Sequence, residues 1–154
     1  MMTINAMTPE GVCFDGLYLH RAKLMGLSLN GASFVSCDLR ASNMEDAQAK
    51  RVNFSGASLI GVDAARAYLH ESVFHHCRLN HTNFKHADLS RADLSDAEIS
   101  DTNFEGCNLR GTTMLAHNLH SAHFKDASFD RHTILPEEFK PLEHGAILME
   151  DETA

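Results

Sequence analysis

The sequence contains no apolar run long enough to span a membrane, and its N-terminus lacks a basic region followed by an apolar stretch. Its four cysteines include no C-x-x-C pair, the spacing that many zinc sites use. Ser, His and Asp are abundant, but no nucleophile–base set, paired buried carboxylates or phosphate-binding loop stands out. These absences predict a cytoplasmic protein that is not an enzyme and holds no metal or other cofactor.

What the sequence does contain is a period of five residues. A centre residue recurs at every fifth position from Phe14 to Phe129, giving 24 units with eleven Leu, eight Phe, two Met, one Ile and two Ala. The residue two positions earlier is nearly always small, and seven of the nine Gly lie two positions after a centre, where a tight turn can require positive φ. Helices repeat at about 3.6 residues and strands at 2. The period therefore predicts a chain that turns a corner every five residues.

Three of these units, 87–91, 92–96 and 57–61, read ADLSR, ADLSD and ASLIG. They resemble the A-(D/N)-L-x-x unit of the pentapeptide repeat family, and the resemblance covers roughly residues 12–131. It implies an all-β fold, the right-handed quadrilateral β-helix, here with about six coils and a short C-terminal helical cap. We expect a leader or cap over 1–11, the β-helix over 12–134, and a C-terminal cap with a possible dimerisation tail over 135–154.

Four corners per coil put residues i and i+20 in one column. The centre residues then sort by type, with Phe in one column and Leu in the next, which supports four units per coil independently of the resemblance. His117 falls at a small inward position, either as a tolerated bulky residue or as the sign of a local bulge. The predicted core consists of centre residues: Phe14, Leu19, Phe34, Leu39, Phe54, Leu59, Phe74, Leu79, Leu89, Leu94, Phe104, Leu109, Phe124 and Phe129.

Beyond residue 134 the repeat breaks. Pro136, followed by Glu137 and Glu138, predicts the start of a short helix that covers the last coil. The apolar residues that follow have two interpretations, an extension of the cap or a homodimer contact. The first is the simpler interpretation, and the resemblance makes the second reasonable, because several family members dimerise end to end through this region. The candidate dimer contact comprises Phe139, Leu142, Ile147, Leu148 and Met149.

Two residue types invite a chemical interpretation. Cys37, Cys77 and Cys107 fall at small inward positions, and two in one column lie too far apart for a disulfide, so a reduced protein is expected. Five histidines cluster in the middle of the chain, three of them on successive corners of one coil, which predicts a polar belt. A metal site and a pH-responsive partner surface are the alternatives. These five are His70, His75, His76, His81 and His86.

The charge is unevenly distributed along the chain. The net charge is −8, yet residues 1–85 carry 7 acids and 8 bases, whereas residues 86–154 carry 14 acids and 5 bases. Direct nucleic-acid binding is disfavoured, because phosphates require a basic stripe. The acidic half supplies the candidate interaction residues Asp88, Asp93, Asp96, Glu98, Asp101 and Glu105.

Two functions follow. The first is a non-catalytic scaffold or adaptor, a rigid rod that binds another protein. The second comes from the resemblance, because the family includes DNA mimics that bind type II topoisomerases such as DNA gyrase and modulate sensitivity to quinolones or peptide toxins. The acid excess fits mimicry, while the eight bases of the first half interrupt every face. We expect a protein partner, with no nucleic acid or membrane bound directly.

Overall fold

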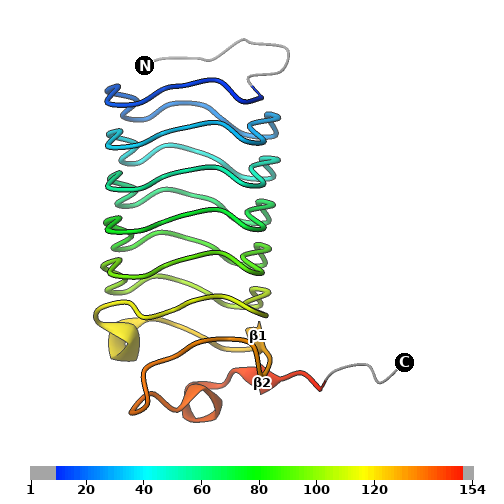
Figure 1. The fold of residues 1–154 in the computed structure, drawn as a ribbon. Coiled ribbons are helices and arrows are strands. Elements are labelled where there is room, and N and C mark those ends of the chain that lie inside the picture. The colour runs from blue at the N-terminus through cyan, green and yellow to red at the C-terminus, as the bar shows by residue number, and fades with distance from the viewer. Residues whose placement is uncertain (1–9, 151–154) are drawn as a thin grey trace.

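The structure, a computed structural model, describes residues 10–150 and shows them as a stack of coils with the N-terminal coil at one end (Figure 1). Parallel β-bridges hold the coils together. From Cys13↔Ser33 to Asp93↔Thr113, every bridge joins residue i to residue i+20. Because each coil has twenty residues and a turn every five, the chain is a parallel β-helix with four turns per coil.

The corners are β-turns that begin at the centre residue. In the turns from Phe14 to Leu109, with the exception of the one at Ala49, the centre carbonyl accepts a hydrogen bond from the N–H three residues on, as in Ala22 N to Leu19 O at 2.9 Å. The third residue of the turn has φ between 53° and 70° in an unbroken series from Gly16 to Gly111, as a type II turn requires. The expected positive φ at the glycines is confirmed, and thirteen non-glycine residues in that series share it.

The centre residues point inward and form the core. Twelve of the fourteen predicted core residues are buried, and Phe14 and Phe129, near the two ends of the stack, are partly buried. Phe14, Phe34, Phe54 and Phe74 stack with 4.8–5.5 Å between successive ring centroids. Stacked aromatic pairs add about 0.5–1.5 kcal/mol each beyond the area they bury, so this column stabilises the contact between successive coils.

The small inward residues also contribute hydrogen bonds. Hydroxyl and thiol groups at this position donate to the centre carbonyl 23 residues earlier, as in Ser42 Oγ to Leu19 O at 2.9 Å and Cys77 Sγ to Phe54 O at 2.8 Å. The buried cysteines are therefore more than apolar spacers, because their thiols satisfy a backbone acceptor of the neighbouring coil. The same bond is made by Cys37, Ser72, Thr82, Thr102, Cys107 and Thr112.

The i+20 register of the bridges first breaks at Glu98. Glu98 pairs with His117, nineteen residues on, because Ala116 occupies the inward position in place of His117. Asn118, with φ 66°, and the 3₁₀ helix η1, Leu119–Ser121, then restore the register. Of the two interpretations of His117, the local bulge is the correct one, because the backbone is irregular here. The His117 side chain points outward and is 64% exposed.

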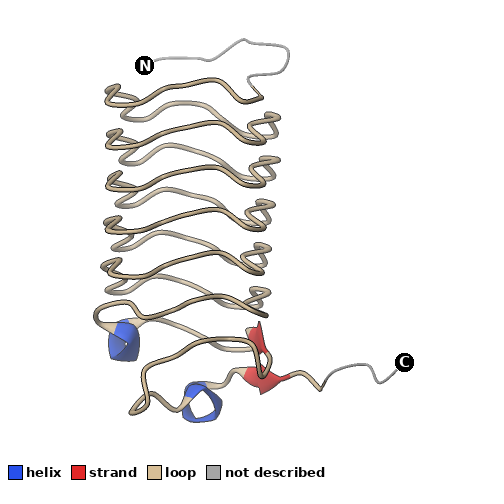
Figure 2. Ribbon diagram, in the orientation of Figure 1, coloured by secondary structure: helices blue, strands red, loops and turns tan. Residues whose placement is uncertain are grey.

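The C-terminal segment folds back under the last coil (Figure 2). The predicted helix start at Pro136 is wrong, because residues 137 and 138 form a turn. The only helix of this segment within the described residues is the 3₁₀ helix η2, Pro141–His144. Strand β2, Ile147–Leu148, pairs in parallel with β1, Ser128–Phe129. Within residues 10–150, no helix combines the length and the hydropathy needed to span a bilayer.

Candidate interaction surface

The six candidate acidic residues lie around one coil, on its different sides, and do not form a single patch. Asp88 and Asp93 occupy bridge positions, where each carboxylate accepts a hydrogen bond from the backbone N–H two residues on, at 3.0 and 2.9 Å. These two carboxylates therefore support turns. Asp96, Glu98 and Asp101 are exposed and follow one another across a single side of the rod.

Glu105, one of the six, and Asp46 are paired with bases one coil away. Lys85 Nζ lies 3.1 Å from Glu105 Oε1, and the Lys85 ammonium lowers the pKa of that carboxyl. Arg66 binds Asp46 through Nε and Nη2, both at 2.9 Å, and lowers the pKa of Asp46. Because each partner lies twenty residues from the other, the pairing follows from the coil length.

One corner shows the same alternation over three coils. Glu71 lies between two guanidinium groups, with Arg51 Nε at 3.3 Å from Oε2 and Arg91 Nη1 at 3.8 Å from Oε1. All three side chains are more than a third exposed, so each pair contributes little to stability. Their effect is on the surface potential, because positive and negative groups alternate along this corner.

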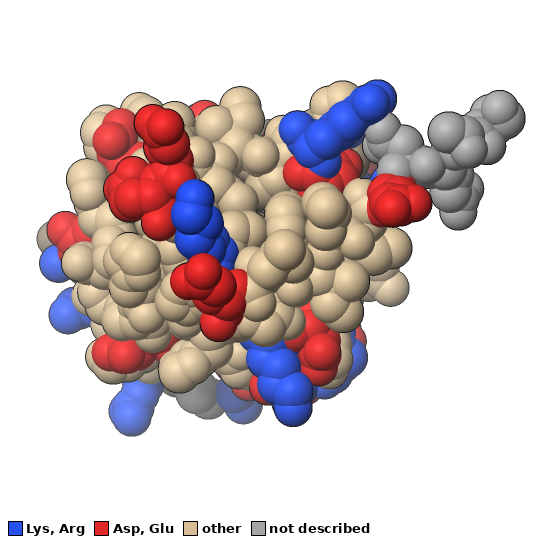
Figure 3. All heavy atoms as spheres, turned by 90° about the horizontal axis from the view of Figure 1, so that it is seen from below, with Lys and Arg blue, Asp and Glu red and all other residues tan. Residues whose placement is uncertain are grey.

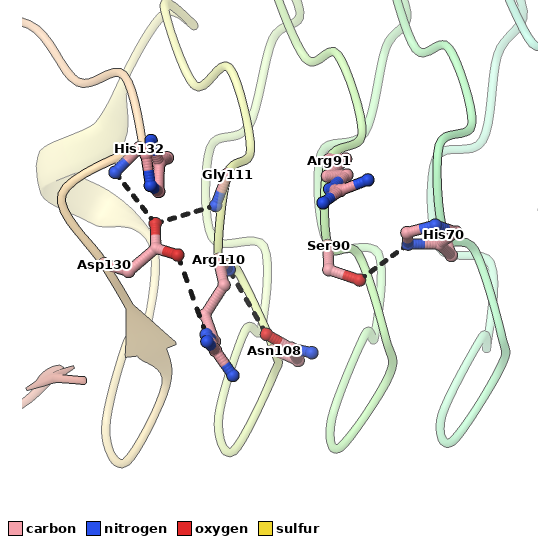
Figure 4. A pocket seen from close by; sticks show the side chains of 8 residues that line it. All are labelled: His70, Ser90, Arg91, Asn108, Arg110, Gly111, Asp130 and His132. Atoms are coloured by element: carbon pink, nitrogen blue, oxygen red, sulfur yellow. Dashed lines mark hydrogen bonds and ion pairs between the residues drawn. The ribbon is translucent and has the colours of Figure 1, made fainter. Parts of the chain in front are cut away.

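A polar groove lies beside this corner, near the C-terminal end (Figure 4). Its volume is about 730 Å³, and its lining comprises His70, Ser90, Arg91, Asn108, Arg110, Gly111, Asp130 and His132. Exposed Arg91 and Arg110 give it cationic donors, while His70 Nδ1 is held by Ser90 Oγ at 2.8 Å. The groove therefore offers mainly hydrogen-bonding groups to a protein surface.

Asp130 lines the groove and belongs to the candidate site, although the sequence analysis did not single it out. Its carboxylate, 8% exposed, accepts hydrogen bonds from Gly111 N and His132 N, both at 3.0 Å, and lies 3.6 Å from Arg110 Nε (Figure 4). Burial raises its pKa, but these hydrogen bonds outweigh burial and hold it below the usual value. The sequence pattern gave no signal for it, because the one-residue insertion that places Asp130 here becomes visible only in the structure, as the Thr113↔Ile134 bridge across 21 residues.

The candidate dimer residues divide into one buried and four exposed side chains. Phe139 is 4% exposed and packs inside the cap, whereas Leu142 is 61% exposed and does not cover the last coil. Ile147, Leu148 and Met149 are 47%, 51% and 41% exposed. Uncharged residues cover much of this end of the rod, with charges of both signs among and around them (Figure 3). The exposed apolar side chains of Ile147, Leu148 and Met149 favour contact with another protein.

The five clustered histidines do not converge as a group. His81 and His86 lie on corners of their own, and His70 lies in the groove. His75 and His76 are adjacent, with 4.0 Å between ring centroids, and they approach Asp96 of the next coil.

The twenty-residue coils, the type II turns and the inward centre residues define a solenoid protein built from five-residue repeats. The chain belongs to the pentapeptide repeat family: the family described as pentapeptide repeat region matches residues 47–124, and pentapeptide repeats (8 copies) matches residues 18–56. No curated protein sequence matches the chain.

Solved structures of other pentapeptide repeat proteins are similar to this one. The protein alr5209 from Nostoc PCC 7120 is 27% identical, with 84% of this chain and 83% of that chain covered and a TM-score of 0.37. Full-length QnrB1, a plasmid-mediated fluoroquinolone resistance protein, is 17% identical over 96% of this chain and 89% of its own, with a TM-score of 0.39. HetL from Nostoc sp. strain PCC 7120, involved in regulating heterocyst differentiation, is 16% identical over 93% and 87%, with a TM-score of 0.41.

Proposed function

We propose that this protein is a non-catalytic interaction rod, a cytoplasmic scaffold or adaptor that binds another protein through its flat sides. In this proposal the stack is a right-handed quadrilateral β-helix of about six coils with a capped C-terminal end. One observation carries the function: acids and bases alternate along the corners, as in Arg51–Glu71–Arg91, so the rod presents mixed charge rather than one continuous acidic face.

The groove of Figure 4 is the binding region that this proposal favours. It is concave and carries charged groups of both signs, and the Asp130 carboxylate holds its base together through contacts with Gly111, His132 and Arg110. Complementary charges across such an interface contribute to specificity and association rate more than to raw affinity.

The test is quantitative capture from a lysate of the source cell with purified protein as bait. We expect a reproducible partner that the Arg91→Ala/Arg110→Ala bait loses at least fivefold and that an Arg40→Ala bait, altered on a different side, retains. Equal capture by all three baits would place the binding region elsewhere. Capture of nothing above background by the wild-type bait would contradict the interaction rod.

A second candidate is a DNA mimic that binds a type II topoisomerase such as DNA gyrase. The specific observation in its favour is the row of exposed carboxylates Asp96, Glu98 and Asp101 across one side of the rod. A DNA gyrase supercoiling assay with and without a quinolone discriminates the two functions. Inhibition or protection at low micromolar protein, abolished by neutralising these three residues, supports mimicry, and no effect at high concentration excludes it for gyrase.

We also propose that the apolar C-terminal end forms a homodimer contact. Strand β2 pairs with β1 on one edge, and Ile147, Leu148 and Met149 leave apolar side chains exposed beside it. Sedimentation velocity should show a dimer that Leu148→Asp converts to monomer. Leu115→Asp serves as the control, because Leu115 is 46% exposed elsewhere on the rod. A monomeric wild-type protein at high concentration would contradict the dimer.

A further inference from the structure

One corner of the rod brings together three metal-ligating side chains from two coils. His75 and His76 follow the centre residue Phe74, and Asp96 occupies the same turn position as His76 one coil further on. Positive φ at His76 and Asp96, 55° and 57°, places both in equivalent left-handed turns. One ligand atom from each of the three residues lies within 4.8 Å of the others.

A second observation concerns the imidazole of His75. Its Nδ1 is buried and has no hydrogen-bond partner among residues 10–150. Buried polar atoms are nearly always partnered, and an exception calls for an explanation such as an unseen ion. Coordination of a cation through this nitrogen would supply the missing partner.

The irregular turn adds a fourth group. Because Ala116 takes the inward position, His117 points outward, and its Nε2 lies 4.0 Å from Asp96 Oδ1. Asp96 therefore has histidines on both sides, His76 in the preceding coil and His117 in the following one. No other corner within the described residues repeats this set: His81 faces Asp101 at 3.9 Å without a second histidine.

We propose that His75, His76 and Asp96 bind a divalent transition-metal ion, with His117 able to complete the set. Imidazole nitrogen with carboxylate oxygen suits zinc, copper or nickel rather than calcium or magnesium. Zinc–nitrogen bonds of about 2.0–2.1 Å require ligand atoms closer than they now lie. His76 and Asp96 are exposed, so their side chains have room to rotate towards a shared ion. The ion would link two successive coils.

This proposal departs from the polar belt that the sequence analysis favoured. The predicted belt consists of His76, His81 and His86, and these three residues do lie on separate corners. The convergence instead involves a residue twenty positions further on, because residues i and i+20 share a column. The proposal does not depend on the identity of the protein partner.

The experiment is isothermal titration of zinc chloride into the full, tag-free chain after dialysis against EDTA, at about pH 7.5 where imidazole is mostly neutral. We expect one ion per chain, with affinity at least about tenfold weaker in His76→Asn and in Asp96→Asn. His81→Asn is the matched control, since it removes a histidine from the same turn position and should leave the affinity unchanged within twofold.

Thermal unfolding of the same proteins provides an independent readout. Zinc should raise the Tm of the wild type and of His81→Asn, while the metal-free variants should unfold at wild-type temperature because the replaced side chains are exposed. Asparagine tolerates the left-handed turn conformation. The proposal is overturned if the wild type takes up no zinc, or if His76→Asn and Asp96→Asn bind it as tightly as the wild type.

Discussion

Phe139, from the segment beyond the repeat, packs against Phe124, the last residue of its column, with 5.3 Å between ring centroids. Phe124 continues a stack that begins at Phe84, so a residue outside the five-residue pattern ends that column. His144 of η2 stacks on Phe139 in turn, at 4.7 Å. The cap therefore closes an otherwise open core through aromatic contacts.

Phe139→Ala should lower the free energy of unfolding by about 3–5 kcal/mol, because it removes a buried ring and leaves a cavity at the end of the core. Urea unfolding followed by circular dichroism measures the change. Leu142→Ala is the control, since that side chain is 61% exposed and should change stability by no more than about 0.5 kcal/mol. Equal effects of the two substitutions would contradict the assigned cap.

The positive φ at the corners predicts that exchanging glycine for alanine and alanine for glycine in one column changes stability in opposite directions. Ala41 has φ 56° and Gly61, one coil further on, has φ 66°. A Cβ at Gly61 would meet no atom within 4 Å, so only the backbone conformation matters. Gly61→Ala should cost about 1–2 kcal/mol, and Ala41→Gly should gain somewhat less, because glycine loses more entropy on folding. Changes of the same sign in thermal unfolding would be inconsistent with this.

Much of the fold could be predicted from the sequence because a five-residue period leaves few options for which side chains face inward. Leu19, Phe54 and Leu94 are buried as the register requires. The predictions were wrong or open where the period is interrupted. Pro136 is locally suited to begin a helix, but the turn at 137–138 instead brings Phe139 onto the core, and tertiary packing outweighs the local preference.

The surface was harder to predict than the core. Lys85 and Glu105 were counted separately as a base and an acid, although a separation of twenty residues places them 3.1 Å apart. The groove depends on a one-residue insertion near Asp130, and an insertion has no period from which its geometry could be derived. Surface charges are therefore best compared between residues i and i+20, because a count of charges along the chain does not show which acids and bases lie side by side.

Arg40 and Asp38 predict a component of acid sensitivity. Arg40 Nε and Nη2 donate to the two carboxylate oxygens of Asp38 at 2.8 and 2.6 Å, and this side-chain hydrogen bonding lowers the pKa of Asp38 to about 2. The unfolded value is about 3.9. Since the folded pKa is the lower one, the stabilisation is present above about pH 4 and is lost as the pH falls towards 2.

Arg40→Gln should therefore raise the pKa of Asp38, which an NMR titration of its carboxyl carbon measures directly. At pH 6 the loss of stability should stay below about 1 kcal/mol, because the Arg40 side chain is 53% exposed and its charge is screened by solvent. Arg78→Gln removes an arginine that forms no ion pair within the described residues, and it should leave the titration of Asp38 unchanged. An unshifted Asp38 in Arg40→Gln would contradict the assignment.

The four cysteines should differ sharply in reactivity. Cys13 is exposed, whereas Cys37, Cys77 and Cys107 are buried and donate their thiol hydrogens to backbone carbonyls. Burial raises the pKa of Cys77 to about 12 and also raises those of Cys37 and Cys107. Because the thiolate is the reactive form, the buried thiols remain protonated and unreactive at about pH 8.

Alkylation of the folded protein with iodoacetamide, followed by intact mass measurement, should give one adduct, and alkylation in concentrated guanidinium chloride should give four. The single adduct should disappear in Cys13→Ser, which identifies its site without disturbing a buried residue. Rapid addition of more than one group to the folded protein would show that the coils open faster than a core of stacked phenylalanines and inter-coil thiol hydrogen bonds permits.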